Sequence, residues 1–273
     1  KPLEQQDDNI RFFDHRREDS RTDWDRDGLP SEDWEALLAE VVRRADRAGH
    51  YRYPAPTEYG GQDGTNLDMA VIREHLAAKG LGLHNDLQNE HSIVGNNISL
   101  LLMLNYGSEE QKAEWVDSLA NGTQGFAFGI TEPLHGSDAT HMETTAHRDG
   151  DKWVINGEKW FSSNARYSTF LIVMVITDPD NPPYQQQSMF LVPTDTPGVN
   201  IMRNVGLGYE SEADDHGSHA YIRYENVRVP KENLLGPRGG GFIVAQTRLG
   251  GGRIHHAMRT SGRVQRIFDM MCE

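Results

Sequence analysis

Apolar residues recur at helical spacing in the first part of the chain. From Ser31 onward they fall on one helical face, at Trp34, Leu37, Leu38, Val41, Val42 and Ala45. Pro30 and Ser31 provide a start signal for this helix, and Gly49 provides a stop. After a glycine-rich connector, Asn66 is expected to cap a second helix with a similar apolar pattern.

Two further helices are predicted before the pattern changes. The third ends near Leu104. Ser108 and Gln111, three residues apart, form a capping box in which each side chain satisfies a backbone N–H of the other. This box opens a fourth helix that stops at Asn121-Gly122. Residues 1–125 are therefore predicted to form an all-helical N-terminal domain.

Short strand-like runs separated by turn dipeptides follow. Asp149-Gly150 and Asn156-Gly157 are typical of hairpin turns with positive φ, and they flank a predicted strand at 152–155. The unbroken apolar, β-branched run 170–176 predicts a buried strand. Residues 126–235 are thus predicted to form an antiparallel β domain, a barrel or a sandwich. Its remaining strands are expected at 189–192, 220–224 and 227–230.

Helical spacing returns after the glycine-rich connector 236–241, at Ile254, Met258, Val264, Phe268 and Met271. The chain begins without methionine, and it ends at Glu273 within this amphipathic pattern. We therefore interpret residues 236–273 as a linker and the first helix of an incomplete C-terminal helical domain, and the chain as a fragment or a processed product. The predicted fold class is α+β, with several domains.

Composition narrows the possible partners. The formal net charge is −14, from 41 acidic and 27 basic residues, which argues against a nucleic-acid partner or an anionic membrane surface. The longest apolar runs are much shorter than the roughly 20 residues that a membrane-spanning helix needs. The single cysteine, Cys272, excludes an internal disulfide and fits a reducing compartment, with the cytoplasm as the default.

Two segments carry the candidate chemistry. Residues 126–138 read FAFGITEPLHGSD, and residues 156–164, about two dozen positions later, read NGEKWFSSN. Together they offer apolar and aromatic surface for the face of a planar ring, and hydroxyl and backbone N–H groups for its polar edge. Taken singly, each reads as a strand with ordinary core aromatics, so the inference depends on the ordered pair.

This pair resembles the flavin-holding segments of the acyl-CoA dehydrogenase family, and the resemblance extends from about Trp34 to the end of the chain. The order of helical domain, β domain and helix is that of the family. Further landmarks in the same order are Glu58-Tyr59-Gly60-Gly61, the helix start at 106–112, Thr196-Pro197-Gly198-Val199 and Asn226-Val227-Arg228-Val229-Pro230. The resemblance implies FAD as the cofactor and a role in fatty acid metabolism.

For the first segment, the resemblance implies five cofactor-binding residues. Phe128, Ile130 and Thr131 would lie along the isoalloxazine ring, with the Thr131 hydroxyl at its pyrimidine edge. Gly136 and Ser137 would lie near the phosphates, where the absence of a side chain at Gly136 lets the backbone approach closely.

For the second segment, the resemblance implies that Phe161 lies against the ring, that Ser163 points at flavin N5, and that Ser162 belongs to the same cofactor-binding set. Family members often carry Trp and Thr where this chain has Phe161 and Ser163. An aromatic face and a hydroxyl are kept, so the departure concerns affinity or redox tuning.

The implied reaction is the α,β-dehydrogenation of an acyl-CoA thioester, with a carboxylate base removing the α-proton. In some branches of the family this base precedes an Arg, a position held here by Gly252 before Arg253. We expect the base in sequence beyond Glu273, and an inactive fragment. Glu132 and Glu158 are interpreted as solvated or structural carboxylates.

The family position also suggests a substrate site. It would include Ser137 together with Gly251, Gly252 and Arg253. The last three lie in the run 249–256, which is expected to start a helix whose N-terminus suits an anionic or carbonyl-bearing ligand.

Alternatives remain open at this point. The same fold is used by flavin-dependent monooxygenases or oxidases, and a non-catalytic subunit of a hetero-oligomeric dehydrogenase is compatible with Gly252. Family analogy implies a homo-oligomer (a dimer or tetramer) when complete, electron transfer to a flavoprotein carrier of the electron-transfer flavoprotein type, and, in a eukaryote, the mitochondrial matrix or peroxisome. A metal site at Asp214, Asp215, His216 and His219 is the less favoured reading of a polar loop.

Overall fold

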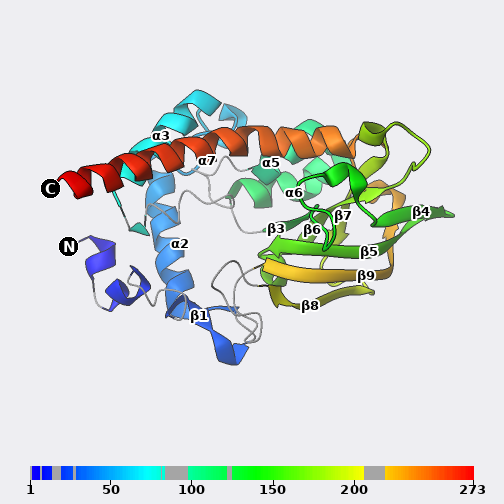
Figure 1. Cartoon of the computed structure of the whole chain (residues 1–273), viewed down its shortest axis with the longest axis horizontal. Helices are drawn as coiled ribbons and strands as arrows, with labels where there is room; N and C mark the ends of the chain where they lie inside the picture. The colour runs from blue at the N-terminus through cyan, green and yellow to red at the C-terminus, as the bar shows by residue number, and fades with distance from the viewer. Residues whose placement is uncertain are drawn as a thin grey trace. The chain divides into compact units, whose positions relative to one another are not determined.

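The computed structural model describes residues 2–6, 8–13, 20–26, 29–80, 82–83, 98–121, 125–205 and 219–273. Contacts divide the chain into two compact units (Figure 1). One contains Lys1–Leu101, Leu119–Gly122 and Arg248–Glu273, and the other contains Leu102–Ser118 and Thr123–Thr247. The domain limits expected from the sequence stay a prediction.

The helix expected after Ser31 is present as α2 (Glu32–Arg47), with Ser31 at its N-cap. Its buried residues Trp34, Leu37 and Val41 pack with Phe12, whose ring lies 5.4 Å from that of Trp34. The apolar stripe read from the sequence is therefore the face that the helix buries.

Helix α3 (Asn66–Ala78) begins one residue earlier than expected. The N-cap is Thr65, because its side chain accepts from the Asp68 N–H while the Asp68 carboxylate accepts from the Thr65 N–H. A complete capping box satisfies two helix-end N–H groups, which Asn66 alone would not. The cap predicted at Asn66 was wrong.

Helices α5 (Ile98–Tyr106) and α6 (Glu109–Asn121) follow. The capping box before α6 is confirmed, since the Ser108 N–H donates to Gln111 Oε1 at 3.0 Å and the Gln111 N–H donates to Ser108 Oγ at 3.2 Å. The side-chain amide of Gln111 also donates to the carbonyl oxygens of Glu232 and Leu234. The expected stop at Gly122 lies outside the described residues.

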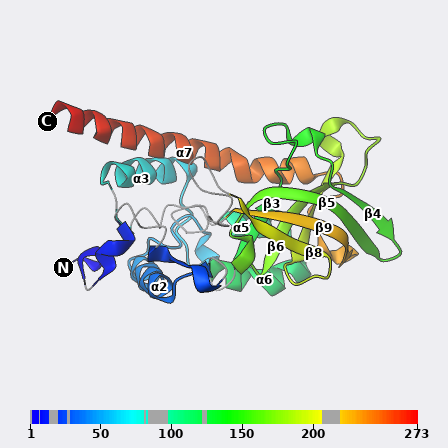
Figure 2. The same cartoon turned by 60° about the horizontal axis from the view of Figure 1, so that its bottom comes forward.

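One eight-stranded sheet dominates the second unit (Figure 2). Its order is β10-β7-β6-β4-β5-β9-β8, with β3 beside β6. The predicted antiparallel β domain is confirmed, with two exceptions: the β3–β6 and β4–β6 pairs are parallel. Among the described strands no pairing joins β10 to β8, and no closed barrel is found. The strands are β3 (Phe126–Gly129), β4 (Thr145–Asp149), β5 (Lys152–Ser163), β6 (Phe170–Ile176), β7 (Gln187–Pro193), β8 (Val199–Val205), β9 (His219–Pro230) and β10 (Leu234–Leu235).

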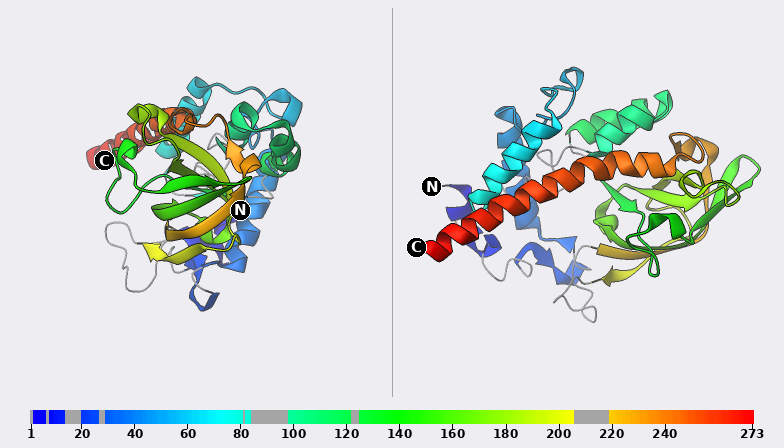
Figure 3. Two further views of the ribbon diagram at one scale, coloured as in Figure 1. Left: turned by 90° about the vertical axis from the view of Figure 1, so that its right-hand side faces the viewer. Right: turned by 45° about the horizontal axis from the view of Figure 1, so that its top comes forward.

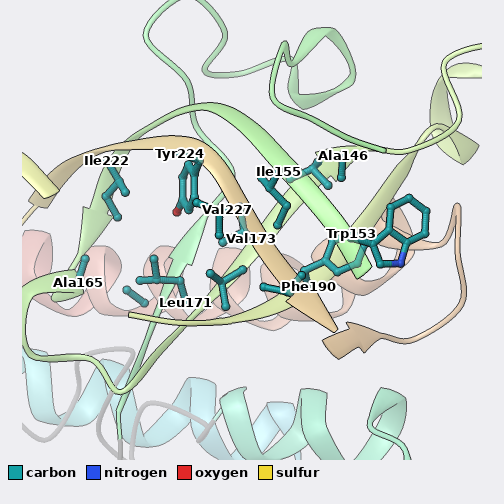
Figure 4. Packing of buried hydrophobic residues seen from close by; sticks show 14 of the residues in the cluster. Ala146, Trp153, Ile155, Ala165, Leu171, Val173, Phe190, Ile222, Tyr224 and Val227 are labelled. Carbon is teal, nitrogen blue, oxygen red and sulfur yellow. The ribbon is translucent and has the colours of Figure 1, made fainter. Parts of the chain in front are cut away.

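The core of this unit is aliphatic and aromatic. The strand predicted at 170–176 is confirmed as β6, with its first six residues buried. Figure 4 shows side chains of the strands packed together in this core. They include Trp153, Leu171, Val173, Phe190, Ile222, Tyr224 and Val227. Burial of such a cluster fixes the positions of the strands that carry the candidate site.

The second turn expected in this region does not exist. Asn156-Gly157 lies inside β5, where the pairing with β9 shifts between Ile155 and Gly157. Gly157 has φ +141°, and a Cβ atom there would lie 2.6 Å from the Cα of Thr144. A β-bulge that needs glycine has the same sequence signature as a tight turn. Asp149-Gly150 does form the turn between β4 and β5, with φ +64° at Gly150.

Helix α7 (Gly241–Cys272) is one continuous helix, coloured orange to red in Figure 3. It begins at the last glycine of the connector, well before residues 249–256. The helix start expected at 249–256 was therefore wrong, and this run has no free helix N-terminus to offer a ligand. No helix in the described part of the chain combines the length and apolarity needed to span a bilayer.

Short elements complete the fold. They are β1 (Thr22–Asp23), β2 (Leu29–Pro30), and the 3-10 helices η1 (Leu3–Gln5), η2 (Asn9–Phe13), η3 (Trp24–Arg26), η4 (Thr57–Tyr59), η6 (Ala139–His141), η7 (Ala165–Tyr167), η8 (Pro183–Gln185) and η9 (Lys231–Asn233).

Candidate functional site

The two segments singled out in the sequence meet in the second unit. The first leaves β3 at Gly129, and the second forms the end of β5. The Trp160 N–H donates to the carbonyl oxygen of Thr131 at 2.7 Å, which joins the segments directly. Thr131 therefore lies beside Trp160, which directly precedes Phe161 in the chain.

A buried ion pair fixes this junction from the inside. Lys159 is fully buried, and its Nζ donates to Glu132 Oε1 at 2.7 Å and to the Ile130 carbonyl at 3.1 Å. The Glu132 carboxylate also accepts the N–H groups of Glu143 at 2.5 Å and Thr144 at 3.0 Å. One lysine thus ties β5 to the first segment, and one carboxylate ties that segment to the chain entering β4.

Burial and ion pairing have opposite effects on the pKa values of Lys159 and Glu132. Burial lowers the pKa of Lys159 to about 8, although the Glu132 charge favours the ammonium form. For Glu132, burial favours the neutral form, but Lys159 and the backbone N–H donors outweigh it and lower its pKa. Glu132 is therefore an ionised structural carboxylate. Of the two interpretations drawn from the sequence, solvated or structural, the second applies.

Glu158 also forms an ion pair. Its Oε1 accepts from the Arg223 Nε at 3.0 Å, and both side chains are part-exposed. Glu132 and Glu158 therefore each have a cationic partner.

The end of β5 presents an aromatic platform. The rings of Trp160 and Phe161 are stacked, with centroids 5.4 Å apart and planes 9° apart. Phe161 has φ +56°, a strained conformation for a residue with a side chain, and its pairing with β9 is interrupted there. This kink leaves Phe161 37% exposed, the most exposed aromatic residue of the sheet strands.

Ser162 and Ser163 have different environments. Ser162 is fully buried, and its hydroxyl finds no hydrogen-bond partner among the described residues. Ser163 is half-buried, and its Oγ lies 2.7 Å from Nδ1 of His219 on β9. The Ser163 side chain is thus partly accessible at the sheet surface, whereas the Ser162 side chain is enclosed.

The first segment supplies unused donors. Gly136 and Ser137 are exposed, and no other part of the described chain bonds their backbone N–H groups or the Ser137 hydroxyl. A Cβ atom at Gly136 would meet nothing within 4 Å, so the space above this backbone is open. The Thr131 hydroxyl likewise has no partner within the described residues. Phe128 and Ile130 are half-buried at the end of β3.

The remaining predicted residues lie elsewhere. Gly251, Gly252 and Arg253 lie within α7 and belong to the other compact unit; both glycines are half-buried and Arg253 is exposed. Of the four loop residues considered for a metal, only His219 is described, and no group of three potential ligands is found in the described residues.

A cavity of about 590 Å³ in the second unit is lined by residues of α6, β7 and β9, among them Trp115 and Leu191. None of the predicted site residues lines it. Two of its side-chain amides, Gln111 and Asn233, are already bonded to backbone carbonyls. This cavity is therefore separate from the two segments.

Two family models match the chain, the acyl-CoA dehydrogenase N-terminal domain over residues 4–123 and the acyl-CoA dehydrogenase middle domain over residues 127–227. The chain belongs to the acyl-CoA dehydrogenase family. Among curated relatives, acyl-CoA dehydrogenase FadE2 of Mycobacterium tuberculosis is 44% identical over 239 residues, which are 86% of this chain and 56% of FadE2. The chain spans about half the length of that relative.

Solved acyl-CoA dehydrogenases share the fold. A Mycobacterium abscessus acyl-CoA dehydrogenase is 32% identical with a TM-score of 0.76, over 93% of this chain and 62% of that one. A Mycobacterium smegmatis glutaryl-CoA dehydrogenase, solved in complex with FADH2, is 26% identical with a TM-score of 0.65, over 85% of this chain and 56% of that one.

Reading the sequence as an acyl-CoA dehydrogenase missed two residues of this site. Lys159 stands 27 residues from Glu132, and His219 stands 56 residues from Ser163. Lys159 gave no clear signal in the sequence, because the strand around it also contains Asn156 and Glu158, and its burial appears only in the fold. His219 gave no signal either, because its partner depends on the register between β5 and β9.

Proposed function

We propose that the complete protein is an FAD-dependent acyl-CoA dehydrogenase that removes hydrogens from the α and β carbons of an acyl-CoA thioester. The observation that carries the proposal is the junction of the two segments, where a backbone hydrogen bond of 2.7 Å and the buried Lys159–Glu132 pair hold Thr131 beside Trp160, the residue before the exposed Phe161. An FADH2 complex of a related glutaryl-CoA dehydrogenase supports the choice of cofactor.

The residues present fit a flavin. The exposed Phe161 ring, supported by Trp160, offers a flat apolar face for the isoalloxazine. The hydroxyls of Thr131 and Ser163 are the hydrogen-bonding groups proposed for its polar edge, and Gly136 and Ser137 offer open backbone N–H groups for the phosphates. Ile130 and Phe128 would line the ring, with Ser162 contributing backbone. When bound, FAD supplies the acceptor for the hydride that leaves the β carbon.

The base is proposed to lie outside residues 1–273. Gly252 has no proton-accepting group, and Glu132 and Glu158 are both held by cations. A carboxylate that is already paired and bonded to N–H donors is a weak base. Ser137, Gly251, Gly252 and Arg253 are proposed to contact the acyl-CoA, and the complete protein is proposed to form a homo-oligomer that passes electrons to a flavoprotein acceptor.

The test is the flavin spectrum of the complete protein under anaerobic conditions. We expect yellow protein whose absorbance near 450 nm bleaches on addition of an acyl-CoA, as oxidised flavin becomes reduced. Acyl-CoA esters of several chain lengths serve as substrates, and free coenzyme A as the control that binds without reducing. A complete protein that remains colourless with added FAD would contradict the proposal.

The same experiment separates a second function. Gly252 and the two paired carboxylates are also compatible with a non-catalytic subunit of a hetero-oligomeric dehydrogenase. Such a subunit would bind FAD but would not bleach with any acyl-CoA in the absence of its partner. Rapid oxygen consumption without an added acceptor would instead indicate an oxidase or monooxygenase.

A further inference from the structure

His219 touches both side chains of the second segment that face the proposed cofactor. Its Nδ1 lies 2.7 Å from Ser163 Oγ. Its ring meets the Phe161 ring edge to face, with centroids 6.2 Å apart and planes 71° apart. Ser163 and His219 are directly paired between β5 and β9, so the sheet register itself creates these contacts.

The contact with His219 restricts the rotation of the Ser163 hydroxyl. A serine hydroxyl has one hydrogen and two lone pairs, and it rotates to suit its surroundings. An imidazole nitrogen at 2.7 Å occupies one of these hydrogen-bonding positions, as donor or as acceptor according to its tautomer. The remaining positions then point in fixed directions. His219 therefore determines which hydrogen-bonding group Ser163 can present at the sheet surface.

The contact with Phe161 holds a strained residue. Phe161 keeps a positive φ of +56°, which persists only where the surroundings enforce it. Trp160 stacks on one side of its ring, and His219 meets it edge to face. The half-exposed residues of β9 continue this surface, because Tyr221 lies 6.1 Å from Trp160 and Arg223 pairs with Glu158. The Phe161 ring is thus presented in one orientation while it stays partly exposed.

We propose that His219 is a positioning residue for the cofactor, orienting the Ser163 hydroxyl and holding the Phe161 ring at the surface where the flavin lies. This inference rests on the proposed function, because it assigns a role within the same site.

The test compares four variants of the complete protein. His219→Ala removes both contacts, whereas His219→Asn can place its amide where Nδ1 stood. His219→Gln places its amide further out, and His147→Ala removes an exposed histidine of β4 as a matched control. The readouts are the dissociation constant of FAD from the apoprotein and the absorption spectrum of the bound flavin. Near-ultraviolet circular dichroism checks the fold.

We expect His219→Ala and His219→Gln to weaken FAD binding about tenfold and to shift the flavin absorption bands, while His147→Ala stays close to the wild type. His219→Asn keeps a partner for Ser163 but not the ring against Phe161, so its effect should lie between those of His147→Ala and His219→Ala. If His219→Ala does not fold, the contrast between Asn and Gln carries the test. In a Ser163→Ala background, where the hydroxyl is absent, His219→Ala should add a clearly smaller spectral shift than it causes in the wild type, because only the contact with Phe161 is then left to lose.

The outcomes are distinguishable. A wild-type protein that binds no FAD overturns the proposed function and with it this role. A wild-type protein that binds FAD, with His219→Ala and His219→Gln indistinguishable from it, overturns the role of His219 alone. A spectral shift that persists undiminished in the Ser163→Ala background also overturns it, because His219 would then act independently of the hydroxyl.

Discussion

Replacing Lys159 with Met is expected to lower the free energy of unfolding by about 3–5 kcal/mol, since removing one partner of a buried pair leaves the other charge uncompensated. The Glu132 carboxylate would then stay buried with only the N–H groups of Glu143 and Thr144 to stabilise it. The Ile130 carbonyl would also lose its donor. Thermal unfolding followed by circular dichroism should show a midpoint lower by roughly 6–15 °C.

Two comparisons sharpen this prediction. Arg223→Met breaks the neighbouring part-exposed pair with Glu158, and it should move the midpoint little, because solvent screens such pairs. In the Lys159→Met background, Glu132→Gln should recover part of the loss, since it removes the uncompensated charge and keeps an oxygen that accepts a backbone N–H. A Lys159→Met protein as stable as Arg223→Met would show that the buried pair does not hold the segments together.

Gly157→Ala is the second change with a large expected effect, a loss of about 2–4 kcal/mol of unfolding free energy. Gly157 has φ +141°, a region that side-chain-bearing residues rarely adopt, and the added Cβ would lie 2.6 Å from both Cα and Oγ1 of Thr144. Neither the backbone nor a short side chain so close to it has room to yield. The bulge that sets the direction of β5 before Lys159 would therefore be lost or displaced.

Gly150→Ala is the matched control for this change. Gly150 also has positive φ, +64°, but a Cβ there meets nothing within 4 Å. Its substitution costs only the backbone strain, about 1 kcal/mol. Denaturant or thermal unfolding gives the loss of stability for each variant. Gly150→Ala reports backbone strain alone, and Gly157→Ala reports backbone strain together with steric overlap. Equal losses for Gly150→Ala and Gly157→Ala would contradict the close approach of β5 to Thr144.

Features that depend on neighbours in sequence were predictable. The Ser108–Gln111 capping box and the apolar run 170–176 were confirmed residue by residue, because capping geometry and strand burial are encoded within a few positions. The stripe of α2 that includes Trp34 and Leu37 was confirmed for the same reason. The two segments, in this order, also predicted the acyl-CoA dehydrogenase family. The family models that match residues 4–123 and 127–227 confirm it.

Features that depend on distant partners were not predictable. Asn156-Gly157 has the composition of a hairpin turn, and only the pairing of β5 with β9 shows that it is a bulge. The family resemblance implied a helix start at 249–256, yet α7 already begins at Gly241 and carries this run in its interior. Lys159 and His219 acquire their roles from contacts made across the sheet by residues far away in sequence.

The most direct test of the central claim is a titration of FAD into the apo form of the complete protein, monitored by flavin fluorescence, with Phe161→Ala and Tyr184→Ala as the compared variants. Both are exposed aromatic residues of the same unit, but Tyr184 lies on η8 and packs against Phe242 of α7, not at the junction of the two segments. We expect Phe161→Ala to weaken FAD binding at least about tenfold, through loss of its ring face, and Tyr184→Ala to bind as the wild type does. Equal affinity of the two variants for FAD would contradict the account.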